Sequence, residues 1–207
     1  DKIAVLSGPS HAEEGARHIP TTVVSASANT ELATRIQSAF STDSFRIYTN
    51  DDVIGVELAG SVKNVIAVAA GICDGLGLGD NTKGALLTRG LLEMTRLGVR
   101  RGARQETFFG LAGMGDLITT CMSQHSRNRR FGDLIGSGLT MQEALRQMTM
   151  VAEGVETTRS VHELAKREGI EMPITEQVYQ ALFEGKPARQ ALHDLMTREA
   201  KPERHDV

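Results

Sequence analysis

Lys63 stands nearly alone in a long apolar run. In ELAGSVKNVIAVAAGICDGLGLGDN (residues 57–81), Lys63 and Asn64 are the only strongly polar residues between the first two acidic ones. Removing an ammonium group from water favours its neutral form, so a buried lysine can exchange a proton near neutral pH. The alternative is a snorkelling side chain whose charged end reaches water. Because so little else in this run is polar, we favour a chemical role for Lys63.

A carboxylate has a similar setting further along the chain. Asp116 lies in the apolar stretch LAGMGDLITTC, residues 111–121. It is either a helix cap or a buried carboxylate that needs a partner. A lysine would serve, because an ion pair holds the ammonium group in place and offsets its desolvation.

Residues 126–130, SRNRR, gather a hydroxyl, an amide and three guanidinium groups. The pattern is typical of a helix N-terminus, with Ser126 as the cap. Arginine side chains and helix N-termini both suit phosphate oxygens. A solvated basic patch is the alternative interpretation, and we assign Arg129 and Arg130 to it.

The first 49 residues alternate strands and helices. Apolar or β-branched runs predict strands at residues 3–9, 21–27 and 45–50, with helices at 10–17 and 29–40. Ser10 and Glu13 have the S-x-x-E spacing of a capping box. The alternation predicts one end of a parallel α/β sheet whose missing strands lie upstream.

No strand is predicted after Asn50, which we take as the N-cap of a long helix. Further caps are expected from the box Thr140–Glu143, from Gly169 and Gly185 at helix ends and from Pro173 and Pro187 in first turns. The predicted fold is mainly α with an α/β remnant. The helices expected in the all-helical part, residues 50–207, span about 51–73, 83–103, 127–137, 140–148, 154–168, 173–184 and 187–199.

Composition excludes several classes of protein. The 207 residues carry 23 Lys and Arg against 26 Asp and Glu, a net charge of −3 that draws the chain to neither nucleic acid nor membrane. No apolar stretch is judged to reach the roughly 18 residues of a membrane span, and no signal peptide is recognised. Cys73 and Cys121 show no metal-ligand spacing and are expected as buried thiols. A cytoplasmic protein without a metal site is predicted.

Three motifs together carry a resemblance to a known family. GSVKNVIAVAAGICDGLGLGDNTKGAL (60–86), GLAGMGDLITTC (110–121) and SRNRRFG (126–132) resemble the C-terminal half of bacterial NAD(P)-dependent glycerol-3-phosphate dehydrogenases. The resemblance covers essentially the whole chain, and Ser61, where Ala or Thr is usual, is a minor departure. It implies reversible, metal-free reduction of dihydroxyacetone phosphate to sn-glycerol 3-phosphate with NADPH or NADH, for glycerophospholipid synthesis.

The same resemblance implies a domain organisation. Residues 1–49 would end a Rossmann-type nucleotide-binding domain, and residues 50–207 would form a helical substrate domain similar to the C-terminal domain of 6-phosphogluconate dehydrogenase. The family's strand–GxGxxG–helix and its second substrate lysine are not in this sequence. The chain, which opens on DKIAVLSGP, therefore resembles a fragment that is inactive alone. A homodimer is a family expectation.

Individual roles also follow from the resemblance. Lys63 matches the catalytic general acid, which protonates the substrate carbonyl oxygen and acts as the base in reverse. Asp116 matches a carboxylate that would partner it, with Thr120 close by. The implied substrate-binding residues are Gly8, Ser10, Lys63, Asp116, Ser126, Arg127 and Asn128, and the implied cofactor contacts are Ala12, Arg127, Val151 and Glu153. From composition alone, Val151 would be a packing residue.

Two other functions stay open. A β-hydroxyacid or ketopantoate-type dehydrogenase shares the lysine on a buried helix, but is not expected to carry the phosphate cluster of residues 126–130. A non-enzymatic helical module could bind nucleic acid or an acidic partner through RNRR. The net charge and the lack of interleaved aromatic residues speak against that module.

Overall fold

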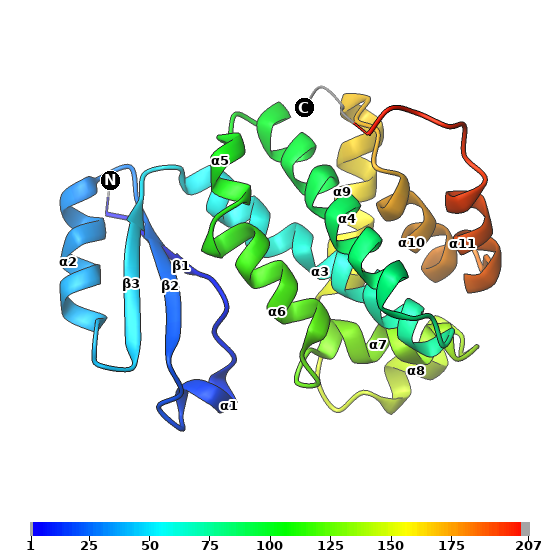
Figure 1. The fold of residues 1–207 in the computed structure, drawn as a ribbon, viewed down its shortest axis with the longest axis horizontal. Helices are drawn as coiled ribbons and strands as arrows, with labels where there is room; N and C mark the ends of the chain where they lie inside the picture. Colours follow the sequence, from blue (N-terminus) through cyan, green and yellow to red (C-terminus); the bar gives the residue numbers. More distant parts are fainter. Residues whose placement is uncertain (1, 204–207) are drawn as a thin grey trace.

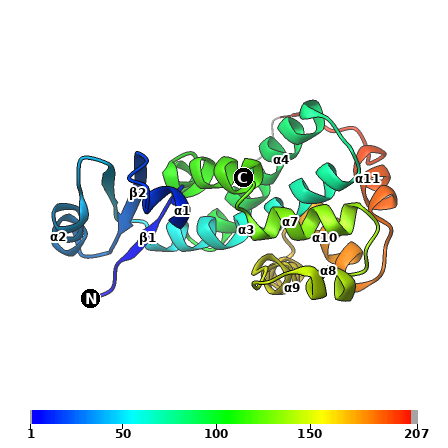
Figure 2. The ribbon, with the colours of Figure 1, turned by 90° about the horizontal axis from the view of Figure 1, so that it is seen from below.

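The computed structural model describes residues 2–203. A small sheet with its helices occupies one end of an elongated molecule, and a helical domain forms the rest (Figures 1 and 2). The elements are β1 (Val5–Ser7), α1 (Ala12–Gly15), β2 (Thr21–Ala26), α2 (Thr30–Phe40), β3 (Phe45–Asn50), α3 (Val53–Gly75), α4 (Asp80–Arg100), α5 (Gln105–Phe108), the π-helix η1 (Leu111–Gly115), α6 (Asp116–Met122), α7 (Arg127–Gly136), α8 (Met141–Gln147), α9 (Gly154–Glu168), α10 (Pro173–Phe183) and α11 (Ala188–Met196).

The sheet has the order β1-β2-β3 and is only partly parallel. β2 and β3 are parallel, with Thr21 opposite Phe45, and the helix α2 provides the crossover between them. β1 pairs antiparallel with β2, with Val5 opposite Ala26. The prediction of a parallel sheet is therefore wrong for β1. A parallel connection needs a crossover element, and α1, a single turn of four residues, is too short to provide one.

The start of α1 also differs from the prediction. Its N-cap is His11, whose side chain makes no capping hydrogen bond. The hydroxyl of Ser10 donates instead to the carbonyl of Gly8 at 2.9 Å. Gly8 has a φ of +143°, so the chain turns sharply before the helix can begin. The capping box of Ser10 and Glu13 is therefore not formed.

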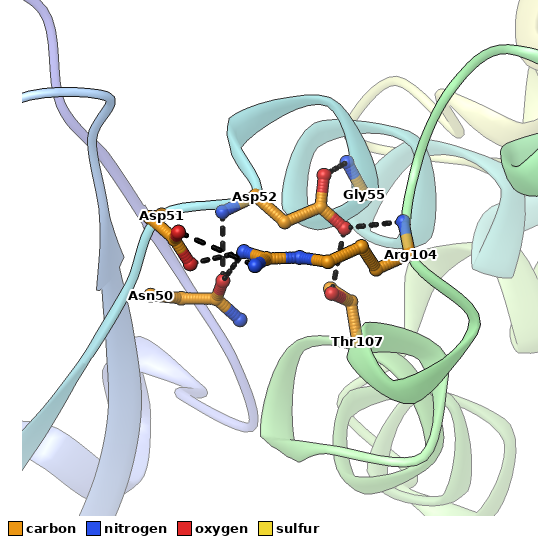
Figure 3. Close-up of polar contacts among 6 residues, drawn as sticks. All are labelled: Asn50, Asp51, Asp52, Gly55, Arg104 and Thr107. Carbon is orange, nitrogen blue, oxygen red and sulfur yellow. Dashed lines mark hydrogen bonds and ion pairs between the residues drawn. The ribbon is translucent and has the colours of Figure 1, made fainter.

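The sheet is joined to the helical domain at Asp52 (Figure 3). Its carboxylate accepts hydrogen bonds from Gly55 N at 2.9 Å, Arg104 N at 2.8 Å and Thr107 Oγ1 at 2.6 Å. Asp52, and not Asn50, is thus the N-cap of α3. Asn50 ends β3, and its side-chain oxygen accepts from Asp52 N at 2.8 Å. One side chain therefore fixes the first turn of α3 against the segment that carries α5.

The helix α3 is the centre of the helical domain. α4, α6, α7 and α9 all pack against it, and most of its second half is buried. By length and composition α3 could cross a membrane, so the sequence prediction that no stretch is long enough is wrong. In the structure 56% of its most apolar window is buried inside the protein. This is the behaviour of a core helix.

α3 and α7 touch backbone to backbone. A Cβ atom on Gly71 of α3 would lie 1.9 Å from the carbonyl oxygen of Arg129, and one on Gly132 of α7 would lie 2.0 Å from the carbonyl oxygen of Val68. Real Cβ atoms never approach oxygen so closely, so both positions require glycine. The two helices are consequently held in one register.

Most of the predicted helices are confirmed, with ends shifted by a few residues. The capping box of Thr140 and Glu143 is present, Pro173 is the first residue of α10, and Gly169 ends α9 in the left-handed conformation. Residues 105–122, for which no helix was predicted, form α5, η1 and α6. These elements are only four to seven residues long, and η1 contains two glycines, so they give no clear helical period.

Candidate functional site

Lys63 and Asp116 form an ion pair between α3 and α6. The Nζ atom of Lys63 lies 2.5 Å from Oδ2 of Asp116, and the two side chains are 17% and 6% exposed. The Thr120 hydroxyl donates to Asp116 Oδ1 at 3.2 Å, so Thr120 lies close by as expected. Burial raises the pKa of the Asp116 carboxyl, and the Lys63 ammonium opposes that rise. The predicted partnership of a buried lysine and a nearby acid is confirmed.

The glycine-rich π-helix η1 positions Asp116. A Cβ on Gly113 would lie 2.1 Å from the carbonyl oxygen of Phe108, so η1 packs directly on the backbone of α5. π-Helical turns are rare and occur often at functional sites. Because η1 runs into α6 without a break, Asp116 is the first residue of α6 and is buried beside α3. Asp116 is a buried carboxylate with a partner and is not the N-cap of α6, since Gly115 has that position.

A second group of site residues lies at the N-terminus of α7. Ser126 caps this helix as predicted, accepting from Arg129 N at 3.2 Å. Asn128 is buried, and its side-chain oxygen accepts from Gly154 N at 2.8 Å. Arg127 remains partly exposed and pairs with Glu153, with 2.8 Å between Nη2 and Oε1. The predicted substrate cluster and one predicted cofactor residue, Glu153, are therefore in direct contact.

The Lys63–Asp116 pair and the residues at the start of α7 both contact α3. Asn64 follows Lys63 in the chain, and its carbonyl oxygen would lie 2.9 Å from a Cβ on Gly154. The same Cβ would lie 3.0 Å from Asn128 Oδ1. The Lys63 side chain thus turns to α6, while the backbone of the next residue contacts the joint between α7 and α9.

The loop from Gly8 to Ala12 approaches this site from the sheet. Gly8 is buried against Val23, and Pro9 lies beside Gly115, one residue before Asp116. His11 is close enough to Asp116 for their charges to interact, and its ring centroid is 6.0 Å from that of His125. Its Nε2 atom is buried without a hydrogen-bond partner among the described residues. Sequence reasoning missed His11, although it stands between two residues that it named.

Val151 is exposed, so its interpretation as a packing residue is wrong. It is 71% exposed in the segment before α9, next to Met150, which is also exposed. The sulfur of Met150 lies 3.9 Å from Nη1 of Arg127. This combination of exposed apolar side chains and a guanidinium group is suited to contact one edge of a dinucleotide. Ala12, the first residue of α1, is also exposed.

A third charged group, which the sequence did not reveal, adjoins the site. Asp74 pairs with Lys83, with 2.5 Å between Nζ and Oδ1, and with Arg129, with 2.6 Å between Nε and Oδ2. The assignment of Arg129 to a solvated patch is therefore wrong, whereas Arg130 is exposed as expected. A carboxylate ending an apolar helix was the only signal in the sequence.

The two cysteines are buried free thiols, as predicted. Burial raises the pKa of Cys73 to about 11 and that of Cys121 to about 12. Both stay protonated at neutral pH and are poor nucleophiles. Within residues 2–203, no group of three or more His, Cys, Asp or Glu side chains is placed to hold a metal ion.

Comparison with known proteins gives consistent matches. The family model described as NAD-dependent glycerol-3-phosphate dehydrogenase C-terminus matches residues 52–193, and its N-terminus counterpart matches residues 1–33. Glycerol-3-phosphate dehydrogenase [NAD(P)+] of Geobacter sulfurreducens is 60% identical over 201 residues, 97% of this chain and 60% of that protein. The Clostridium perfringens protein of the same name is 55% identical over 203 residues, 98% of this chain and 61% of its own length.

A solved structure agrees with these matches. The crystal structure of glycerol-3-phosphate dehydrogenase from Coxiella burnetii superimposes with a TM-score of 0.91 at 49% identity, over 94% of this chain and 60% of that one. The chain thus spans about 60% of the length of the relatives that it matches.

Proposed function

Because the chain belongs to the NAD-dependent glycerol-3-phosphate dehydrogenase family, we propose that it is the substrate-binding and catalytic part of such an enzyme. The full-length protein would interconvert dihydroxyacetone phosphate and sn-glycerol 3-phosphate with NADPH or NADH, in glycerophospholipid synthesis. The observation that carries this proposal is the 2.5 Å ion pair between Lys63 of α3 and Asp116 of α6, because α3 also packs against the start of α7 at Arg129. Relatives named for this activity favour it over a β-hydroxyacid dehydrogenase or a binding module.

Lys63 is the proton donor in this proposal. The bound nicotinamide supplies the hydride that reaches C2 of the substrate. As C2 is reduced, the Lys63 ammonium gives a proton to the carbonyl oxygen, which becomes the hydroxyl of the product. Asp116 keeps the ammonium group charged and oriented in its buried position. In the reverse direction the neutral amine takes the proton from that hydroxyl.

The phosphate of the substrate is assigned to the start of α7. The first amides of a helix lack intrahelical acceptors and attract anions. Ser126, Arg127 and Asn128 lie there, and Arg127 supplies a guanidinium with water access. Gly8 and Ser10 would contact the substrate from the sheet. The cofactor edge would comprise Ala12, Val151, Glu153 and Arg127, which are exposed or half-exposed.

Residues 1–49 are proposed as the end of the nucleotide-binding domain and residues 50–207 as the substrate domain. The N-terminal family model, matching residues 1–33, supports the first assignment. A cytoplasmic homodimer without nucleic-acid or membrane partners is the state proposed for the full-length protein. Light scattering on that protein would test the dimer.

A comparison of substrates tests the proposed activity. The full-length protein is assayed with NADH and NADPH against dihydroxyacetone phosphate and against non-phosphorylated 2-keto acids. We expect turnover of the triose phosphate and little of the keto acids. Preference for a keto acid, or no turnover of the triose phosphate, would refute the proposal.

A further inference from the structure

Asp74, Lys83 and Arg129 form a compact charged network beside the site. They come from the last turn of α3, the first turn of α4 and the first turn of α7, whose arrangement Figure 1 shows. The carboxylate of Asp74 is shared by Lys83 and Arg129 at 2.5 and 2.6 Å. The three side chains are only 13–25% exposed. Two cations on one carboxylate leave a net positive charge.

Arg129, which is paired with Asp74, also contacts the loop before α7. Its Nη1 donates to the carbonyl of Ser123 at 3.4 Å, and the amide of Ser126 donates to the same carbonyl at 3.4 Å. The backbone amide of Arg129 donates to Ser126 Oγ at 3.2 Å. Arg129 therefore contacts both ends of residues 123–126, the segment that leads into α7.

Packing of the helices does not account for this network. α3 and α7 are already held by backbone contact at Gly71 and Gly132. A buried or half-buried ion pair contributes little net stability, because desolvation opposes the attraction. Arg130, next in the chain and equally basic, remains exposed. Helix packing alone therefore does not explain why the charge of Arg129 lies in this network.

We propose that Asp74 is a positioning residue for the substrate phosphate, acting through Arg129 on the start of α7. This inference rests on the proposed function and extends it to residues that do not touch the substrate. Asp74 orients the Arg129 guanidinium so that it braces residues 123–126. Lys83 keeps the network positive, so Asp74 does not cancel the charge that attracts the anion. Phosphate affinity then depends on Asp74 while the hydride step does not.

The experiment compares Asp74→Asn and Arg129→Gln in the full-length protein, with Arg130→Gln as the matched control. The measurements are kcat, KM for dihydroxyacetone phosphate, KM for NAD(P)H, Ki for inorganic phosphate as competitor, and Tm. We expect Asp74→Asn and Arg129→Gln each to raise KM for the triose phosphate and Ki for phosphate by about tenfold, the scale of one charge-assisted hydrogen bond. The double variant should be no worse than either one, and Arg130→Gln should match the wild type.

Several results would overturn this inference. A lower Tm with unchanged KM and Ki would leave the network a purely structural role. If Arg130→Gln has an equal effect, KM and Ki depend on the total positive charge and not on the pair of Asp74 and Arg129. If Asp74→Asn does not fold, Arg129→Gln and Lys83→Gln carry the comparison. A wild-type protein inactive on the triose phosphate refutes the proposed function itself, whereas an active wild type with unaltered variants refutes only the role of Asp74.

Discussion

Lys63 Nζ lies 2.5 Å from Asp116 Oδ2, although the two residues belong to different helices, α3 and α6. Each would be costly to bury alone, and each offsets the charge of the other. The pair also adjoins the start of α7 through Asn64 and Gly154. The proposed proton donor and the helix end proposed to bind phosphate thus both contact the core helix α3.

Lys63→Ala should lower kcat at least about 100-fold in the full-length protein, because it removes the proposed proton donor. Lys186→Ala is the matched control, since Lys186 is equally buried and is paired with Asp194 away from the site. Steady-state turnover of dihydroxyacetone phosphate checks both, and circular dichroism confirms folding. A Lys63→Met/Asp116→Asn double variant removes both charges in case the single change unfolds the protein. A tenth of wild-type turnover in Lys63→Ala would remove Lys63 from the chemistry.

Arg127→Ala should raise KM for the triose phosphate by about 10- to 100-fold, the scale of a charge-assisted hydrogen bond. The lost pair with Glu153 is half-exposed and should change the free energy of unfolding little. Initial-rate kinetics with varied triose phosphate give the answer, with exposed Arg130→Ala as the control. An unchanged KM would contradict the phosphate assignment.

Glu93 should make stability fall as the pH rises. Burial raises the pKa of its carboxyl to about 7, although Ile174 N, Thr175 N and the Thr175 hydroxyl donate to it. The folded state therefore holds a proton that the unfolded state releases above about pH 4.5. Between pH 4.5 and 7 the free energy of unfolding should fall by on the order of 2–3 kcal/mol.

Glu93→Gln isolates this effect, because glutamine does not titrate. Urea denaturation from pH 5 to 8 should give a flatter profile for Glu93→Gln than for the wild type. Parallel profiles for the two proteins would show that Glu93 is ionised in the folded state throughout this range.

Gly71→Ala should destabilise the protein by about 2–4 kcal/mol, because its Cβ would meet the carbonyl oxygen of Arg129 at 1.9 Å. Gly84→Ala on α4 is the matched control. A Cβ there meets nothing within 4 Å, so alanine should stabilise the helix by about 0.5–1 kcal/mol. Thermal or urea unfolding measures both. Equal stability of the two variants would contradict the backbone contact of α3 and α7.

Sequence patterns were sufficient for the features that depend on local chemistry. Apolar periodicity placed the long helices of residues 50–207, and N-caps such as Ser126 and Thr140 correctly marked where α7 and α8 begin. The near isolation of Lys63 and Asp116 among apolar residues indicated that each needed a partner. These signals are local because side-chain spacing and capping act within a few residues.

Tertiary contacts decided the features that the sequence did not predict. Whether β1 runs parallel or antiparallel depends on how a connection folds back over the sheet, and whether Asn50 or Asp52 caps α3 depends on Arg104 and Thr107 from a distant segment. Arg129 and Arg130 are identical in type and adjacent in sequence, yet only Arg129 faces the carboxylate that ends α3. Residue type fixes which interactions are possible, but only the packing of α3, α4 and α7 determines which of them form.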